Sequence, residues 1–282
     1  MGYALAREHL PNSKEGRLAM TQDWDAATYD RISDPMYRWG IEVFEWLQLA
    51  GDETVLDAGC GSGRVTEVLA ERLSRGRVIA LDRSATMLAQ ARRRLARFGN
   101  HVVFILADLS RPLPIRNPVD AILSTATFHW IPDHEALFCH LAGILRPGGQ
   151  LAAQCGGTGN IRSVLEAARQ AGVDAADATT FAGVEETRAR LAAAGFVEIE
   201  VWLESKPTPL PPGVPWETYL RTVCLREHLK RIPPTDGDSF VRRVAALLPR
   251  PQIDYVRLNI RARRPSGIAM NKGMRGSMVP AI

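Results

Sequence analysis

One short segment of this chain places an aspartate and three glycines at every second position. An apolar run ends at Asp57, and Gly59, Gly61 and Gly63 follow. Apolar residues then recur at helical spacing from Val65 onward. A strand, a glycine turn and a helix in this order form a concave ligand site. Glycine lets a ligand approach the backbone closely, and the first turn of a helix offers unpaired N–H groups.

The spacing of these glycines bears on which ligand fits. A dinucleotide-binding turn has its third glycine three positions after the second, where this chain has Arg64. The Asp57 carboxylate would also repel a pyrophosphate, whereas it suits a ligand that carries an ammonium group. The segment therefore predicts a site for a cationic ligand rather than for a phosphorylated coenzyme.

Two further acids end the next two predicted strands. We interpret Asp82 as an acceptor of hydrogen bonds from both hydroxyls of a ribose, with Ser84 capping the helix that follows. Asp108 is a candidate acceptor for an adenine amino group, and the N–H of Leu109 could read a ring nitrogen. Met87 could pack on the adenine face or in the core. Since parallel strands end at one crevice, the three acids are expected in a single site.

The fourth predicted strand ends at Ser124 and leads into His129 and Trp130. This strand should lie beside the first across the switch point of the sheet, so its loop should form the far wall of the cleft. His129 is a candidate general base, a hydrogen-bond donor to substrate or a packed residue, and the residues alone leave these open.

The elements that must position these residues alternate along the chain. Strands are expected over 53–58, 77–81, 102–107, 118–124 and 149–155, with a last pair over 196–203 and 254–262. Helices fit 63–74, 84–98 and 133–145. The alternation predicts an α/β fold with a doubly wound, mostly parallel seven-stranded sheet and helices on both faces.

The chain divides into four predicted parts. They are a flexible extension over 1–22, a core over 23–204 and 251–264, a helical lid or substrate insert over 205–250, and a disordered tail over 265–282. A Pro-rich stretch opens the insert and is interpreted as a turn.

Composition narrows the function classes. The 282 residues carry a net charge of +4 spread along the whole chain, which favours a solvated surface over a nucleic-acid footprint. Four scattered cysteines without metal-ligand spacing predict reduced thiols in a cytoplasm and no metal site. No apolar run is long enough to span a bilayer and no signal-peptide pattern is expected, so we predict a small-molecule partner and no membrane.

Together these motifs resemble the small-molecule class I S-adenosylmethionine-dependent methyltransferases, whose fold is Rossmann-like. The matching motifs are Asp57-x-Gly-x-Gly-x-Gly, Asp82, Ala107-Asp108-Leu109, residues 124–130 and Arg146-Pro147-Gly148-Gly149. Within that family the chain is similar to the trans-aconitate 2-methyltransferase group, on Trp24-Asp25-Ala26-x-x-Tyr29, residues 127–134 and residues 255–259. The resemblance spans 23–264. The segment 171–182 is shorter and poorer in aromatic residues than in relatives, which implies a more open or differently shaped pocket.

The resemblance implies S-adenosylmethionine as the cofactor and assigns roles to named residues. The implied cofactor-binding residues are Asp57, Gly59, Gly61, Gly63, Asp82, Arg83, Met87, Asp108, Leu109, Ser124 and Tyr29. The candidate substrate-binding residues are Trp24, Trp130, Arg221 and Arg257, and the candidate catalytic residue is His129.

The implied function is methyl transfer to a small molecule, and O-methylation of a carboxylic acid leads because an ionised carboxylate needs no base. Methylation of a hydroxyl, amine or carbon is the nearest alternative, and it would make His129 the base. A nicotinamide-dependent oxidoreductase and a non-catalytic cofactor-binding module are alternatives from other classes.

Overall fold

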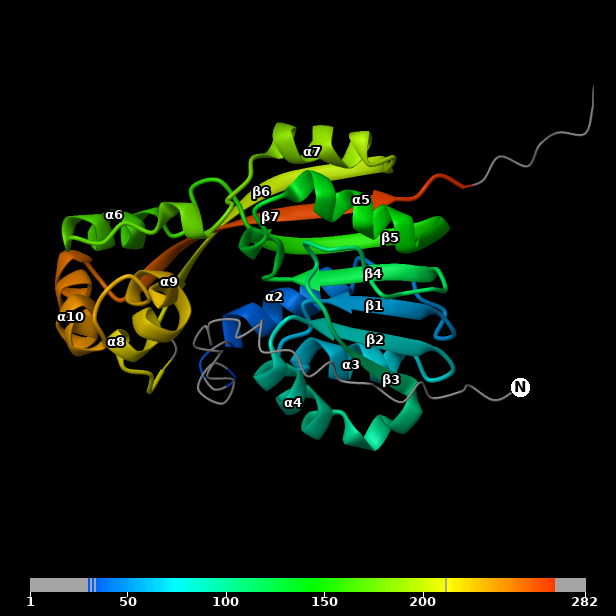
Figure 1. Ribbon diagram of the computed structural model, residues 1–282, viewed down its shortest axis with the longest axis horizontal. Coiled ribbons are helices and arrows are strands. Elements are labelled where there is room, and N and C mark those ends of the chain that lie inside the picture. Colours follow the sequence, from blue (N-terminus) through cyan, green and yellow to red (C-terminus); the bar gives the residue numbers. More distant parts are fainter. Residues whose placement is uncertain (1–29, 31, 33, 211, 267–282) are drawn as a thin grey trace, which may run out of the picture.

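The computed structural model describes residues 30, 32, 34–210 and 212–266. In this part of the chain seven strands form one sheet in the order β3-β2-β1-β4-β5-β7-β6 (Figure 1). Strands β1 to β5 run parallel, and β7 pairs antiparallel with β5 and β6. The strands are β1 (Thr54–Ala58), β2 (Arg77–Asp82), β3 (Val102–Leu106), β4 (Val119–Thr125), β5 (Leu145–Gly156), β6 (Val197–Pro209) and β7 (Gln252–Arg263). The predicted doubly wound sheet is confirmed.

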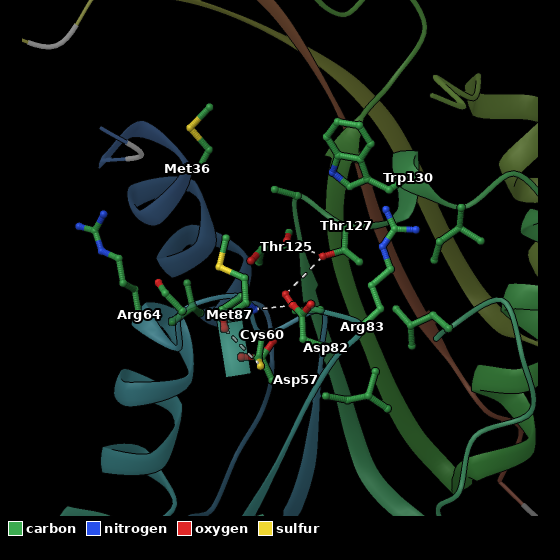
Figure 2. Close-up of a pocket in the computed structure, with 18 of the residues that line it drawn as sticks. Met36, Asp57, Cys60, Arg64, Asp82, Arg83, Met87, Thr125, Thr127 and Trp130 are labelled. Carbon is green, nitrogen blue, oxygen red and sulfur yellow. Dashed lines mark hydrogen bonds between the residues drawn. The ribbon is translucent and has the colours of Figure 1, made fainter. Parts of the chain in front are cut away.

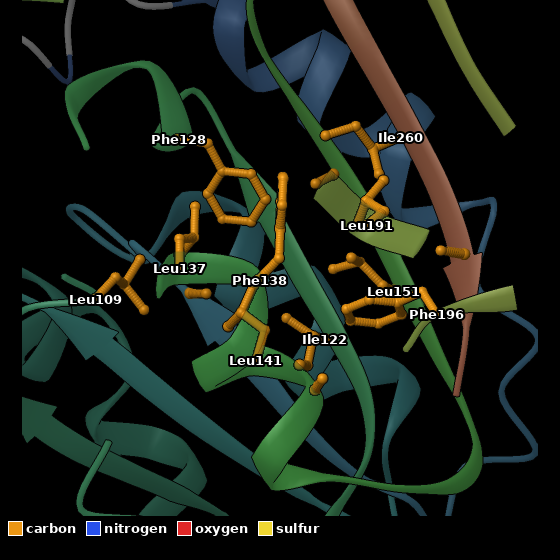
Figure 3. Packing of buried hydrophobic residues seen from close by; sticks show 14 of the residues in the cluster. Leu109, Ile122, Phe128, Leu137, Phe138, Leu141, Leu151, Leu191, Phe196 and Ile260 are labelled. Carbon is orange, nitrogen blue, oxygen red and sulfur yellow. The ribbon is translucent and has the colours of Figure 1, made fainter. Parts of the chain in front are cut away.

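Helices cover both faces of the sheet. One face packs on α2 (Asp34–Phe44), α3 (Arg64–Arg72) and α4 (Ala85–Arg94). The other packs on α5 (His134–Ile144) and α7 (Val184–Ala193), where Phe138 and Leu191 meet Ile122 and Ile260 in one apolar cluster (Figure 3). The central strands are buried on both sides and therefore apolar almost throughout, as is usual for parallel sheets.

The helix expected over 84–98 ends earlier, at Arg94. A 3-10 segment, η1 (Ala96–His101), follows it and contains Gly99 at φ 53°, a left-handed conformation that stops a regular helix. At the other end Ser84 caps α4 as predicted, because its hydroxyl accepts a hydrogen bond from the Met87 N–H at 3.1 Å.

Strands β6 and β7 extend further than predicted and continue beyond the sheet as a two-stranded ribbon (Figure 1). Pro207 and Pro209 lie on β6 rather than in the expected turn. Proline is tolerated there because β6 is the edge strand, where a missing N–H costs no pairing on the outer side.

A group of helices, the distal helices, packs at the end of this ribbon. It comprises α6 (Arg162–Gln170), α8 (Trp216–Tyr219), the π-helical turn η4 (Leu220–Cys224), α9 (Arg226–Leu229) and α10 (Gly237–Leu247). Val164, Tyr219 and Phe240 share one buried cluster, so α6 joins the helices of the predicted insert although it lies outside 205–250. Short 3-10 turns complete the fold: η2 (Phe128–Trp130), η3 (Ala176–Ala178) and η5 (Pro234–Asp236). The extension 1–22 and nearly all of the tail 265–282 lie outside the described residues.

Candidate active site

A pocket opens where β1, β2, β3 and β4 end, and we call it the donor pocket (Figure 2). Eight of the predicted cofactor residues line it. They are Asp57, Gly59, Gly61, Asp82, Arg83, Met87, Asp108 and Leu109. The acids that follow three successive strands do converge on one site, as the sequence predicts.

The first two glycines shape the floor of the donor pocket. Gly59 has φ 87°, and a Cβ built on it would lie 2.1 Å from Oγ1 of Thr127, so no side chain fits. Gly61 has φ 53°, and a Cβ there would meet nothing within 4 Å. The backbone at Gly61 therefore faces open space that a ligand can fill.

Gly63 has a different role from the one expected. It is the left-handed residue (φ 83°) before α3, and a Cβ on it would lie 3.1 Å from the Cβ of Ala91 on α4. It does not line the donor pocket. Glycine is needed there because α3 and α4 pack closely at that point.

Asp82 is held by two backbone N–H groups. Its Oδ2 accepts from the Gly61 N–H at 2.8 Å, and its Oδ1 accepts from the Ser84 N–H at 2.8 Å. Burial raises the pKa of this carboxyl, while the two hydrogen bonds act in the opposite direction. Each oxygen keeps a further lone pair, so the carboxylate is oriented and still able to accept from hydroxyl groups.

Asp57 is a buried acid in the wall of the same pocket. It is 1% exposed, and its Oδ2 accepts from Oγ1 of Thr66 at 2.7 Å. Burial raises the pKa of Asp57 to about 7, against the lowering effect of the Thr66 hydrogen bond, and the charge of Asp82 raises it further. A cation bound beside Asp57 would relieve this cost by favouring the ionised form.

Not every predicted cofactor residue reaches the pocket. Ser124 is 1% exposed and donates from Oγ to the carbonyl oxygen of Ala58 at 2.6 Å, so it ties β4 to β1 instead. Tyr29 and Trp24 lie outside the described residues. Sequence reasoning missed Met36 on α2 and Thr127 after β4, which both line the pocket. The need for glycine at Gly59 signalled that something packs there, but not that it is Thr127.

A second pocket adjoins the first, and we call it the acceptor pocket. Met36, Ala126 and Trp130 line both. Beyond this shared wall the acceptor pocket is lined by His129 and Arg257, which are 8% and 3% exposed. Most of the remaining wall comes from the distal helices and from the segment 171–182, including Phe181, and Tyr255 of β7 and the two residues before α6 complete it. That short segment therefore does cover the pocket.

Hydrogen bonding indicates which ring nitrogen of His129 carries the proton. Its Nδ1 lies 3.2 Å from the backbone nitrogen of Gly156, which can only donate, so Nδ1 is the acceptor. Burial, followed by the charges of Arg257 and His134, lowers the pKa of His129 well below 6.5. The neutral ring then carries its one proton on Nε2 and can donate it to a ligand.

Arg257 on β7 is oriented by a chain of polar contacts across the sheet. Its Nε donates to Oε1 of Gln154 at 3.3 Å, and Nε2 of Gln154 donates to Oδ1 of Asn259 at 2.8 Å. The guanidinium carbon also lies 5.1 Å from the ring centroid of Trp39. Arg221, by contrast, pairs with Asp238 and lines neither pocket.

Two kinds of feature are absent from the described residues. In the described residues no group of three or more His, Cys, Asp or Glu side chains could hold a metal ion. No helix in the same part of the chain is both long and apolar enough to cross a membrane.

The donor pocket fits the S-adenosylmethionine that the resemblance implies. Nothing lies within 4 Å of a Cβ built on Gly61, which would leave room for the ligand, and the buried carboxylate of Asp57 would suit its ammonium group. Asp82 keeps acceptor capacity that ribose hydroxyls could use, and Met87 and Leu109 would give an apolar wall for the adenine.

We expect the affinity for S-adenosylhomocysteine to rise about tenfold from pH 6 to pH 8, because the bound ammonium requires ionised Asp57 and the pKa of that carboxyl is about 7 without ligand. Below pH 7 binding must release a proton, so affinity falls as pH falls. Calorimetric measurement of this affinity from pH 6 to pH 8 tests the prediction. Asp57→Asn should bind weakly with no such slope, whereas Asp52→Asn, a change at an exposed acid, should keep it. An unchanged slope in Asp57→Asn would contradict the assignment.

Comparison with known proteins agrees with this geometry. Residues 55–149 match a family model described as a methyltransferase domain. Trans-aconitate 2-methyltransferase of Methylobacterium nodulans is 36% identical over 181 residues, which cover 64% of this chain and 67% of that protein. The enzyme of the same name from Methylobacterium radiotolerans is 40% identical over 132 residues, 47% of this chain and 49% of that protein. The chain thus spans about half the length of most curated relatives it matches.

Among solved structures, phosphoethanolamine N-methyltransferase 2 of Haemonchus contortus, in complex with S-adenosyl-L-methionine, shares the fold. Its TM-score is 0.60 at 18% identity, over 86% of this chain and 57% of that chain. Taken with the glycine turn and the acids that end β1, β2 and β3, these relationships show that the chain belongs to the class I S-adenosylmethionine-dependent methyltransferases, in the trans-aconitate 2-methyltransferase group.

Proposed function

We propose that this protein transfers a methyl group from S-adenosylmethionine to a carboxylate oxygen of a small acid bound in the acceptor pocket. The observation that carries the proposal is that buried Arg257 and His129, whose proton lies on Nε2, line one pocket, which shares part of its wall with the donor pocket. A guanidinium and a neutral donor together match the two oxygens of a carboxylate. The names of the curated relatives support an acidic acceptor.

When bound, S-adenosylmethionine supplies an electrophilic methyl group. An electron pair of the acceptor oxygen would form the new O–CH₃ bond as the S–CH₃ bond breaks and leaves its electrons on sulfur, so charge would balance and no proton would move. The residues of this chain hold the two reactants in line. Arg257 and His129 orient the carboxylate, and Trp130 and Met36, at the junction of the pockets, help to exclude water.

The protonation states of His129 and Tyr255 in the acceptor pocket favour a carboxylate acceptor over a hydroxyl acceptor. A hydroxyl must lose its proton to a base, and Nε2 of His129 already carries one. Tyr255 is no base either, because burial raises its pKa well above 10 and keeps the phenol protonated. His129 and Tyr255 thus present donors, which an anion that is ionised at neutral pH can use directly.

The proposal includes a lid and a compartment. The helices of 205–250, together with α6, would close the acceptor pocket over its substrate. A cytoplasmic location agrees with four cysteines that form no disulfide, and a small acid rather than a nucleic acid would be the partner.

The test is transfer of radiolabelled methyl from S-adenosylmethionine to a panel of small acids. We expect products that alkali hydrolyses back to the acid, as carboxylate esters are. At saturating S-adenosylmethionine, kcat/KM should stay flat from pH 6.5 to 8.5, because His129 remains neutral throughout. Alkali-stable products, or a rate that rises tenfold per pH unit, would instead indicate a deprotonated hydroxyl or amine acceptor.

A further inference from the structure

The acceptor pocket has few charged side chains in its wall. Among the described residues that line it, Arg257 and Glu227 are the two charged side chains. They lie on different elements, Arg257 on β7 and Glu227 on α9. An acid bound through Arg257 therefore finds one cation and one anion in this wall.

Glu227 forms ion pairs with two cations close to it in the chain. Its Oε1 accepts from Nζ of Lys230 at 2.7 Å and lies 3.4 Å from a guanidinium nitrogen of Arg226. Lys230 and Arg226 line neither pocket. Glu227 thus holds these two cations outside the pocket lining, so a second carboxylate at this wall would meet the Glu227 carboxylate and not a cation.

The histidines of the pocket add no positive charge. Burial lowers the pKa of both His129 and His228, and nearby arginines lower it further. Both rings are neutral at pH 7, so they can donate or accept a hydrogen bond but add no positive charge that would compensate a second carboxylate.

The remaining wall is largely apolar. Leu165 lies on α6 and Ile161 directly precedes that helix. Val223 lies on η4, and Phe181 lies in the segment before α7. Phe181 packs closely, because a Cβ on Gly156 would lie 2.6 Å from its ring. A second carboxylate placed against these side chains would lose its hydration without gaining a partner.

We propose that the acceptor is a monocarboxylic acid with an apolar body, bound with its carboxylate on Arg257 and His129 and its body against Ile161, Leu165, Phe181 and Val223. The inference rests on the proposed function and narrows its substrate class. It sets this chain apart from the relatives named for trans-aconitate, which carries three carboxylates.

Matched pairs of acids test the proposal. Hexanoate, octanoate and phenylacetate are compared with hexanedioate, octanedioate and 1,4-phenylenediacetate, and with trans-aconitate. In the first two pairs a carboxylate replaces the terminal methyl group, and in the third a carboxymethyl group is added to the ring. Binding to the full chain saturated with S-adenosylhomocysteine is measured by calorimetry, and methyl transfer from radiolabelled S-adenosylmethionine is measured separately. We expect each monoacid to bind at least about 100-fold more tightly than its diacid, because the second carboxylate is buried without a partner.

Two variants test whether Glu227 causes the preference for monoacids. Glu227→Gln should narrow the preference for monoacids about tenfold, because it removes the one carboxylate among the described lining residues and the ion-pair partner that holds Lys230. Glu217→Gln, at an exposed acid on α8 that lines neither pocket, should leave the preference unchanged.

The outcomes separate the two proposals. Diacids or trans-aconitate that bind and accept methyl as well as the monoacids would overturn the substrate class and leave the proposed function standing. If S-adenosylhomocysteine binds but no acid of either kind binds or accepts a methyl group, both proposals are wrong. An equal response of Glu227→Gln and Glu217→Gln would remove Glu227 as the cause.

Discussion

Arg257→Met should lower kcat/KM for an acid acceptor by about 100- to 1000-fold while leaving the affinity for S-adenosylhomocysteine within about twofold, since losing a buried partner of a bound carboxylate costs several kcal/mol. Arg257 is 3% exposed, so water cannot replace it at the carboxylate. The donor pocket should not respond, because Arg257 does not line it. Initial rates over a range of acid concentrations, with calorimetry for the nucleoside, check both halves of this expectation.

Two comparison variants sharpen the Arg257 experiment. Arg257→Lys keeps the charge but loses the Nε hydrogen bond to Gln154 and the planar fork, so it should recover part of the lost rate. Arg261→Met removes an exposed arginine of the same strand that pairs with Glu200, and it should behave as the unaltered protein. A parallel loss of nucleoside affinity in Arg257→Met would point to a folding defect instead of substrate binding.

Asp82→Ala should weaken S-adenosylhomocysteine binding by about 10- to 150-fold, because charge-assisted hydrogen bonds to a ribose are worth about 1.5–3 kcal/mol. The substitution also releases the N–H groups of Gly61 and Ser84, which Asp82 now holds at 2.8 Å each. The turn below the ligand would lose part of its order in the free protein. Calorimetry at pH 8, where Asp57 is ionised, isolates this effect.

Asp82→Asn separates the ribose contact from the support of the turn. The amide oxygen can still accept one backbone N–H, so the turn keeps part of its support while the negative charge is lost. We expect an intermediate loss of affinity, and none for Glu71→Gln, an exposed acid on α3. Unchanged affinity in Asp82→Asn would remove the carboxylate charge from nucleoside recognition.

Local patterns in the sequence predicted most of the sheet and the donor pocket. The alternation of apolar strands and helices defines β1 to β5, because each of these elements carries its own periodicity. The acids at 57, 82 and 108 converge because parallel strands end at one edge of a sheet. The role of Ser124 could not be found this way, since an Oγ bonded to Ala58 and an Oγ facing a ligand follow the same strand pattern.

The acceptor pocket was less accessible to sequence reasoning because it depends on contacts between distant segments. The proton position on His129 is decided by the N–H of Gly156 on another strand. Arg221 and Arg257 were equal candidates in the sequence, and packing alone separates the arginine on β7 from the one paired with Asp238. Likewise, α6 joins the distal helices through side chains that a local helical pattern assigns only to some buried face.

The position of strand β7 affects how the sequence of each pocket can evolve. Residues 257–263 of this strand pair with β5 inside the sheet. Tyr255 and Arg257, in its first half, line the acceptor pocket. The donor pocket is built from residues 36–131, largely before this strand begins. Mutations in the distal helices can therefore alter which acceptor fits its pocket without altering the donor pocket, so a lineage can acquire new acceptors while its donor site is inherited intact.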